Sequence, residues 1–142
     1  MNAASQRTRA ELDALLARRF EVISGGDLDR ILDLFVATPV YELATIGRQL
    51  VGRENLRAYY AHLAQSFMPR VSYQMLGAYY GAHEVAFEIL LRYRNDDGRI
   101  EDFYTFAVQH VDQDKFVGER LYASERCYRL MFGECWARLQ PL

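Results

Sequence analysis

The sequence predicts an α+β fold, in which helices in the first half of the chain precede an antiparallel sheet in the second half. Over residues 8–24 and 53–67, apolar residues recur every three or four positions, which is the helical period. Beyond Pro69 the period becomes two, and turn sequences such as residues 95–98 (NDDG) separate the segments. Helices followed by a meander of strands are typical of the α+β class.

Three helices are expected before the meander. The first should begin at Thr8, because Thr8 and Glu11 form a capping-box pattern. Residues 24–26 (SGG) should end it, since glycine tolerates a left-handed closing conformation, and Asp27 can cap a second, short helix. The third helix is expected over residues 53–67. The apolar faces are predicted to include Leu12, Leu15, Leu16, Phe20 and Ile23, then Leu28, Ile31, Leu32 and Phe35, then Leu56, Tyr59, Tyr60 and Leu63.

The remaining segments are expected to form strands. A strand over residues 40–46 turns at Gly47-Arg48 into a short strand over residues 49–51. The four long strands are expected over residues 71–80, 85–94, 100–111 and 116 to about 125. The long strands are apolar on both faces, whereas a sheet with one wet face alternates more cleanly. We therefore expect one face to pack on the helices and the other on a second subunit, as a homodimer.

Composition limits the class of protein. We expect residues 1–142 to form one domain, with a core over about residues 8–126 and a C-terminal tail over residues 127–142. The chain is 51% hydrophobic and 25% charged with a net charge of −2, and acids and bases are interleaved, so no nucleic-acid partner is expected. No apolar run approaches the ~20 residues of a membrane span.

The cysteines and the N-terminal residues bear on location and cofactors. The N-terminal residues are polar with no apolar run behind them, so no signal peptide is expected. Cys127 and Cys135 occur without a CxxC motif or zinc-ligand spacing. We expect free thiols in a reducing, cytoplasmic setting, and neither a metal nor a cofactor.

Five short motifs in the first 123 residues occur in an order found in one known family. They are Arg19-Phe20, residues 26–29 (GDLD), Leu34-Phe35, residues 51–54 (VGRE) and residues 114–117 (DKFV), which look like the family's DGKI hairpin with Asp114 where Gly is usual. Over roughly residues 10 to 123 the chain resembles the SnoaL-like group of the nuclear transport factor 2-like superfamily. The resemblance implies a curved sheet wrapped around a deep, cone-shaped pocket closed by the helices, usually in dimers.

The resemblance implies a small hydrophobic ligand but leaves the chemistry open. Members of the superfamily catalyse ketosteroid isomerisation, polyketide ring closure, epoxide hydrolysis and dehydration, and others bind or transport without chemistry. Glu42 matches the strand carboxylate that shuttles the proton in ketosteroid isomerases. Their oxyanion-hole tyrosine falls on Phe20, and their third-strand acid falls near Phe106 or Ala107. A steroid isomerase of the usual type is therefore disfavoured, and the missing acid also counts against a SnoaL-type cyclase.

Glu42 is the main catalytic candidate. In an apolar pocket, desolvation raises the pKa of a carboxyl group, which suits a general base or acid near neutral pH. The alternative is a strand-edge carboxylate that is solvated or paired with Arg48. His62 could carry a proton because the pKa of histidine lies near neutrality, or it could have a surface or pairing role. Tyr60 lies about 200° around the helix from His62, so the two cannot face the same pocket.

Even-numbered residues of the third long strand share one face. They are Asp102, Tyr104, Phe106, Val108 and His110. If this face lines the cone, Asp102 could take part in proton transfer while the others bind substrate. Alternatively, Asp102 pairs with Arg92, Arg94 or Arg120 across the sheet. Tyr122 on the last strand could orient a ligand oxygen, although cross-strand pairing is again the alternative.

These observations combine into one functional hypothesis. We expect a SnoaL-like enzyme that performs acid/base proton transfer (isomerisation, cyclisation or dehydration) on a hydrophobic cyclic or polyketide-like substrate. The catalytic candidates are Glu42, Asp102 and His62, and the substrate-binding candidates are Phe20, Tyr60, Tyr104, Phe106, His110 and Tyr122. The alternatives are a non-catalytic protein that binds a hydrophobic ligand in the same pocket, and a protein-assembly subunit of the same fold.

Overall fold

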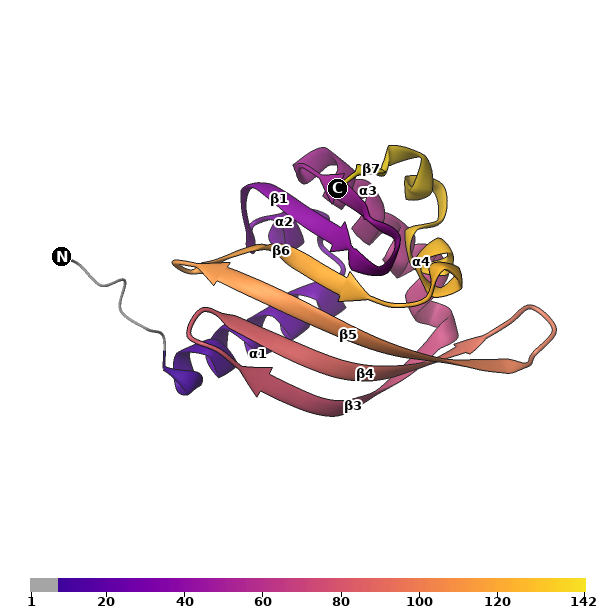
Figure 1. The fold of residues 1–142 in the computed structure, drawn as a ribbon, viewed down its shortest axis with the longest axis horizontal. Coiled ribbons are helices and arrows are strands. Elements are labelled where there is room, and N and C mark those ends of the chain that lie inside the picture. The colour runs from indigo at the N-terminus through magenta and orange to yellow at the C-terminus, as the bar shows by residue number, and fades with distance from the viewer. Residues whose placement is uncertain (1–7) are drawn as a thin grey trace.

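A curved sheet with helices on one side makes up the computed structural model, which describes residues 8–142 (Figure 1). The α-helices are α1 (Arg9–Gly25), α2 (Leu28–Leu32), α3 (Arg53–His62) and α4 (Glu125–Phe132). The strands are β1 (Phe35–Leu43), β2 (Arg48–Val51), β3 (Val71–Tyr80), β4 (Glu84–Arg94), β5 (Ile100–Asp112), β6 (Lys115–Tyr122) and β7 (Gln140–Pro141). The predicted α+β class is confirmed.

Local signals fix the first two helices as the sequence predicts. Thr8 and Glu11 form a complete capping box at the start of α1. Gly26 closes the helix in the left-handed conformation, with φ of 74°. Asp27 then caps α2, because its side chain accepts hydrogen bonds from the backbone N–H groups of Asp29 and Arg30.

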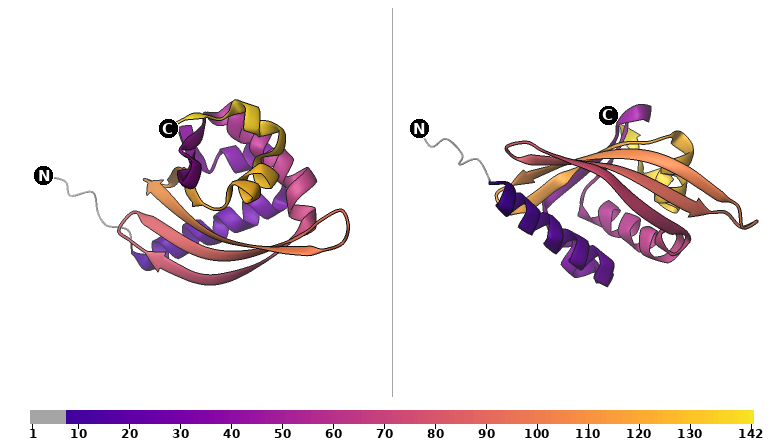
Figure 2. Two further views of the ribbon diagram at one scale, coloured as in Figure 1. Left: turned by 45° about the vertical axis from the view of Figure 1, so that its right-hand side comes forward. Right: turned by 90° about the horizontal axis from the view of Figure 1, so that it is seen from below.

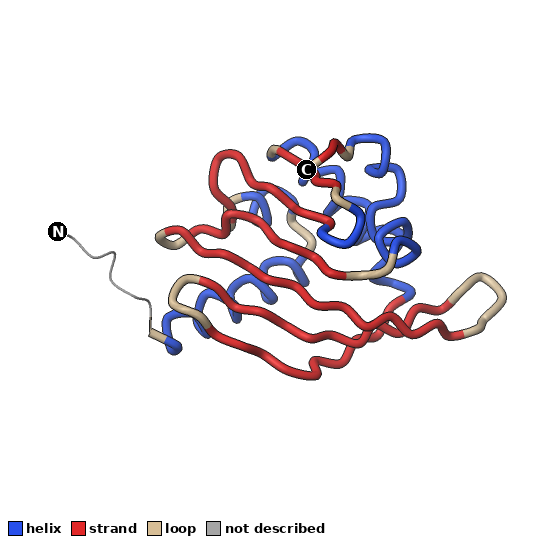
Figure 3. Tube along the Cα trace, in the orientation of Figure 1, coloured by secondary structure: helices blue, strands red, loops and turns tan. Residues whose placement is uncertain are grey.

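The sheet has the order β3-β4-β5-β6-β1-β2-β7. The long strands β3 to β6 pair antiparallel as a meander, as predicted, and β1 pairs parallel with β6. The trace in Figure 3 shows the curvature of the sheet and the β4–β5 hairpin extending beyond it. Helices α1 and α3 lie on the same side of the sheet, so the concave face is covered (Figure 2).

Three elements differ in extent from the prediction. The last long strand, β6, ends at Tyr122 rather than near residue 125, where α4 begins. Strand β1 covers Phe35–Leu43 rather than residues 40–46, and Ala44–Ile46 forms a 3₁₀ turn. Pro39 is tolerated inside β1 because the pairing with β6 shifts register between Phe35 and Val40, where no ladder N–H is required. The third helix stops being α-helical at His62, and residues Leu63–Phe67 form a π-helical turn before Pro69.

The hydrophobic core fills the space between the helices and the concave face. Leu12 and Leu16 of α1, Leu56 of α3 and inward strand residues such as Phe87 and Phe103 belong to one cluster of buried side chains. The C-terminal segment joins this core, because Phe132 of α4 stacks on Tyr59 of α3 with ring centroids 4.4 Å apart. Among residues 8–142, no helix combines the length and apolar character that a membrane-spanning helix needs.

Candidate functional site

A buried arginine lies at the centre of the concave side. Arg19 is on the inward side of α1, and only 3% of its surface is exposed. Its Nη2 atom donates hydrogen bonds to the hydroxyl oxygens of Tyr41, at 3.1 Å, and Tyr60, at 3.3 Å. These two hydroxyl groups are also hydrogen-bonded to each other. One guanidinium and two phenols from three different elements therefore meet at one point.

A carboxylate and an amide complete the cluster. Glu119 Oε1 lies 3.5 Å from Arg19 Nη2 and accepts a hydrogen bond from Gln109 Nε2 at 2.8 Å. Strand register explains the arrangement, because Gln109 of β5 is directly opposite Glu119 of β6, which is opposite Tyr41 of β1. The sheet thus presents three polar side chains in one row, and α1 and α3 add Arg19 and Tyr60 from above.

Aromatic rings enclose this polar cluster. The Arg19 guanidinium lies 4.8 Å from the ring centroid of Phe116 and 5.2 Å from that of Phe35. Tyr59 packs edge-on against both Tyr41 and Tyr60, and all three tyrosines are at most 5% exposed. Only Glu119 retains some contact with solvent, with 11% of its side chain exposed. Electrostatic interactions in such a water-poor setting are stronger than at the surface.

Burial sets the protonation states of the cluster. Desolvation raises the pKa of Tyr41 and of Tyr60 above the ordinary phenol value, so both hydroxyls stay protonated and can donate hydrogen bonds. Burial by itself lowers the pKa of Arg19, but the nearby oxygens of Tyr41, Tyr60 and Glu119 raise it overall. The guanidinium therefore stays charged.

The cluster has hydrogen-bonding capacity that its own members do not use. Among the described residues, Arg19 Nη1 and Gln109 Oε1 are buried without a hydrogen-bond partner. Tyr41 and Tyr60 share one hydrogen bond, so one of their two phenol protons is also left over. Buried polar groups are normally paired. Two kinds of donor and one acceptor in the cluster are thus not used by protein partners.

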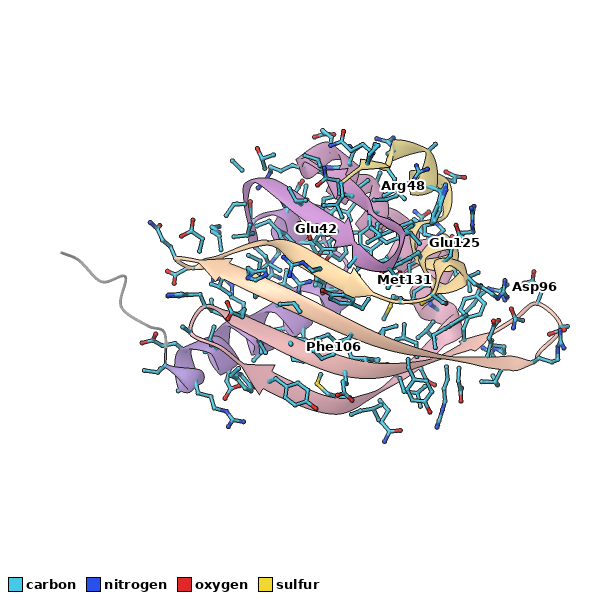
Figure 4. The ribbon with its side chains drawn as sticks, in the orientation of Figure 1. Glu42, Arg48, Asp96, Phe106, Glu125 and Met131 are labelled. Atoms are coloured by element: carbon cyan, nitrogen blue, oxygen red, sulfur yellow. The ribbon has the colours of Figure 1, made fainter. Side chains whose placement is uncertain are left out.

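Glu42 does not lie in this interior, which corrects the expected placement. Its neighbours Tyr41 and Leu43 are buried against the helices, so the alternation along β1 directs Glu42 to the convex face (Figure 4). There Arg120 Nε donates a hydrogen bond to Glu42 Oε2 at 2.9 Å. The predicted alternative of a paired strand carboxylate is correct, with Arg120 as the partner in place of Arg48.

The even-numbered face of β5 also points away from the interior. The buried members of β5 are Phe103, Ala107, Gln109 and Val111. Asp102, Tyr104, Phe106 and His110 therefore line the convex face, and the expectation that they line the cone is wrong. Asp102 faces Arg92 across the sheet, with 3.8 Å between Oδ1 and Nε. Tyr122 of β6 lies on this face too, because its ring packs against Phe106.

The remaining predicted residues are divided between three places. Tyr60 is in the cluster, whereas Phe20 is 38% exposed at the side of α1 and packs edge-on against Phe87. His62 faces the C-terminal segment, where its Nε2 atom lies 3.0 Å from the Leu130 carbonyl oxygen. A separate cleft of about 430 Å³, also lined by Cys135, lies there. Tyr60 and His62 face different surroundings, as their spacing predicts.

Sequence reasoning missed Arg19, Tyr41, Gln109 and Glu119. Arg19 follows Leu12 and Leu16 at helical spacing, and a charged residue within an apolar stripe was the available signal. Gln109 and Glu119 each interrupt an inward row of apolar strand residues. Among residues 8–142, no group of three or more His, Cys, Asp or Glu side chains is arranged to hold a metal ion.

A comparison with known protein families identifies the family of this chain. The SnoaL-like domain family matches residues 16–119. The chain belongs to this family. The match includes Arg19, Tyr41, Tyr60, Gln109 and Glu119, so the whole cluster lies within the SnoaL-like domain. No curated protein matches the chain.

Solved structures share the fold of this SnoaL-like domain at low sequence identity. One is a putative SnoaL-like polyketide cyclase from Jannaschia sp. CCS1, with a TM-score of 0.69, 14% identity, and coverage of 89% of this chain and 96% of that chain. A second is SalBIII, an epoxide hydrolase/cyclase-like enzyme in pyran ring formation in salinomycin (TM-score 0.66, 14% identity, 94% and 97% coverage). A third is an NTF-2-like protein of unknown function from Burkholderia xenovorans LB400 (TM-score 0.58, 20% identity, 81% and 84% coverage).

Proposed function

We propose that this SnoaL-like domain is an enzyme that transfers protons on a hydrophobic, oxygen-bearing small molecule. The observation that carries the proposal is the buried cluster in which the Glu119 carboxylate lies beside Arg19 and the paired phenols of Tyr41 and Tyr60. A base next to several donors is the arrangement that proton abstraction beside a carbonyl group requires. Glu119 and the phenols take the roles first considered for Glu42, Asp102 and His62.

The mechanism divides the cluster into a base and an oxygen-binding part. The Glu119 carboxylate removes a proton from carbon next to a substrate carbonyl, and the carbonyl oxygen gains negative charge. Arg19 and the spare phenol proton of the Tyr41–Tyr60 pair donate hydrogen bonds to that oxygen. Return of the proton from Glu119 to another atom gives isomerisation. Loss of a hydroxyl group from the carbon beyond, which leaves as water with the proton from Glu119, gives dehydration. Attack of the enolate carbon on a second carbonyl carbon, whose oxygen takes that proton, gives cyclisation.

The charge state and the surroundings indicate the kind of substrate. Glu119 already neutralises Arg19, so the cluster favours a neutral molecule over an anionic one. Gln109 Oε1 offers an acceptor to a hydroxyl group of the substrate. The aromatic walls, and the exposed Phe20 and Met75 near the inward side of the sheet, favour a hydrophobic skeleton. The polyketide cyclase and epoxide hydrolase/cyclase-like relatives by fold support the same substrate type.

The proposal is tested by turnover on a panel of cyclic ketones, hydroxyketones, alcohols and epoxides. We expect Glu119→Gln and Tyr60→Phe each to lower kcat by about 100-fold or more, since a positioned acid or base contributes that much. Glu42→Gln is the matched control, because the same change on the convex face should leave kcat within about twofold. Wild-type turnover by folded Glu119→Gln protein would show that the proposed base is wrong.

A binding protein without chemistry is the second candidate. The observation that favours it is the tight packing of Tyr41, Tyr59 and Tyr60, whose rings fill much of the interior. In this case calorimetry should detect a ligand from the same panel, no product should form, and Glu119→Gln should change affinity rather than a rate.

A further inference from the structure

Helix α1 closes the interior and carries one of the functional groups. Its inward residues Leu12, Leu16 and Val22 are at most 6% exposed, and Arg19 reaches from it into the cluster. Figure 2 shows α1 lying along one side of the sheet. A ligand that reaches Tyr41 and Tyr60 has to pass the elements that enclose them. The contacts that hold α1 in place therefore affect access to the cluster.

The C-terminal end of α1 has the properties of a hinge. Two consecutive glycines, Gly25 and Gly26, end the helix, and Gly26 has a φ of 74° that favours glycine. Neither glycine has an atom within 4 Å of the place that a Cβ would occupy, so no packing restricts them. Asp27 starts α2 immediately afterwards and anchors the chain beyond the pair.

The opposite end of α1 is held by surface contacts to the edge strand β3. The hydroxyl group of Tyr80, the last residue of β3, donates a hydrogen bond to Asp13 Oδ1 at 2.5 Å. The Arg9 guanidinium lies 4.5 Å from the centroid of the same ring. This contact is exposed, so water can replace it at small cost, unlike the buried bonds of Arg19. We call Arg9, Asp13 and Tyr80 the latch.

One flank of α1 borders a surface groove. A surface cleft of about 450 Å³ separates the helix from the turn between β5 and β6. Its lining on the helix side is Glu11, Ala14, Leu15 and Arg18, and on the turn side Asp114. Phe20 of the same helix packs edge-on against Phe87 but keeps 38% of its surface exposed. This flank of α1 is therefore exposed to solvent.

We propose that α1 is a hinged lid, which opens the cluster to ligand when the latch releases and completes it again on closing. The inference rests on the proposed function for the role of the cluster. Opening about Gly25 and Gly26 moves Arg19 away from Tyr41 and Tyr60, and closing returns the charge that binds the substrate oxygen. Because opening exposes Leu12 and Leu16, the closed form predominates without ligand.

Amide hydrogen exchange of the full chain without ligand tests the lid. Tyr80→Phe removes the latch hydroxyl and keeps the ring, so exchange in α1 should become about three- to tenfold faster, the effect of losing one hydrogen bond. Tyr79→Phe is the matched control, because Tyr79 also donates to a carboxylate, Glu88 at 2.9 Å, but on the convex face of the same strand. It should leave α1 exchange unchanged.

Location of the effect distinguishes a lid from general loosening. The acceleration should be confined to α1 and absent from β4 and β5, and Asp13→Ala should reproduce it from the other side of the latch. Unchanged α1 exchange in both latch variants, or equal acceleration throughout the sheet, would overturn the proposal. Exchange requires no substrate, so this result is independent of whether Glu119→Gln abolishes turnover.

Discussion

At the scale of single residues, Arg19 is the most costly feature of the protein. A buried charge is strongly unfavourable unless it is paired and hydrogen-bonded. Glu119 supplies the opposite charge, Tyr41 and Tyr60 accept hydrogen bonds, and two aromatic rings face the guanidinium. Well-packed apolar residues in place of the whole Arg19–Glu119 pair would avoid the desolvation of both charges, which points to a functional use for the pair.

Removing this charge should be strongly destabilising. We expect Arg19→Met to lower the free energy of unfolding in urea by about 3–5 kcal/mol, because Glu119 is left as an uncompensated, mostly buried carboxylate. Adding Glu119→Gln should recover part of the loss. The convex-face control is Arg120→Met, whose partner Glu42 is 30% exposed, and it should cost at most about 1 kcal/mol. Additive losses in the double variant would contradict the coupling.

At the scale of elements, the parallel contact between β1 and β6 brings Tyr41 and Glu119 together. The register that places them side by side also sets Val40 against Gly118. Gly118 has a φ of 150°, and a Cβ there would collide with the carbonyl oxygen of Val40. Glycine at this position is therefore a condition for the row of polar side chains.

A side chain at Gly118 should disrupt the row. Gly118→Ala is expected to lower the free energy of unfolding by about 3 kcal/mol or more, since backbone strain and a steric clash combine. Gly98→Ala is the matched control: its φ is 85°, but nothing lies within 4 Å of the added methyl group. It should cost about 1–2 kcal/mol from strain alone. Equal midpoints in thermal unfolding would contradict the proposed close approach.

At the scale of the whole molecule, the convex face of the sheet is rich in uncovered aromatic residues. Tyr79, Phe106 and Tyr122 form a row with ring centroids 6.3 and 6.2 Å apart. Tyr104 beside them is 70% exposed. Leu90 on the same face is only 5% exposed. This composition suits self-association, and the homodimer expected from the doubly apolar strands stays a prediction.

The expected homodimer gives a direct test of that face. If a second copy covers it, Tyr104→Arg places two charges in the interface, and light scattering after gel filtration should show monomer at concentrations where wild type is dimeric. Tyr73→Arg is the control, because Tyr73 is 57% exposed but lies in register with Leu91 on the concave side of the edge strand. Dimeric Tyr104→Arg would exclude this face as the dimer interface.

The start of α1, the break at its C-terminus and the whole of β3 were predictable, because each depends on signals within a few residues. Which face of each strand points towards the interior was not predictable. Both faces of β5 carry apolar residues. Phe103 and Phe106 are therefore equivalent in the sequence, and only the packing of the helices on one face distinguishes them. The placement of Glu42 in the pocket was wrong for the same reason, because the sequence does not show which face of β1 the helices cover.

The sequence by itself determined the class of fold, the order of elements, the family and the separation of Tyr60 from His62, since periodicity, caps and helical angle are local properties. Tertiary structure alone decided the composition of the site. Gln109, Glu119 and Tyr41 meet through register across three strands, and Arg19 joins them from α1, 90 or more residues away from Gln109 and Glu119 in the chain. Such long-range pairing depends on which face the helices cover, and no short window of sequence contains that information.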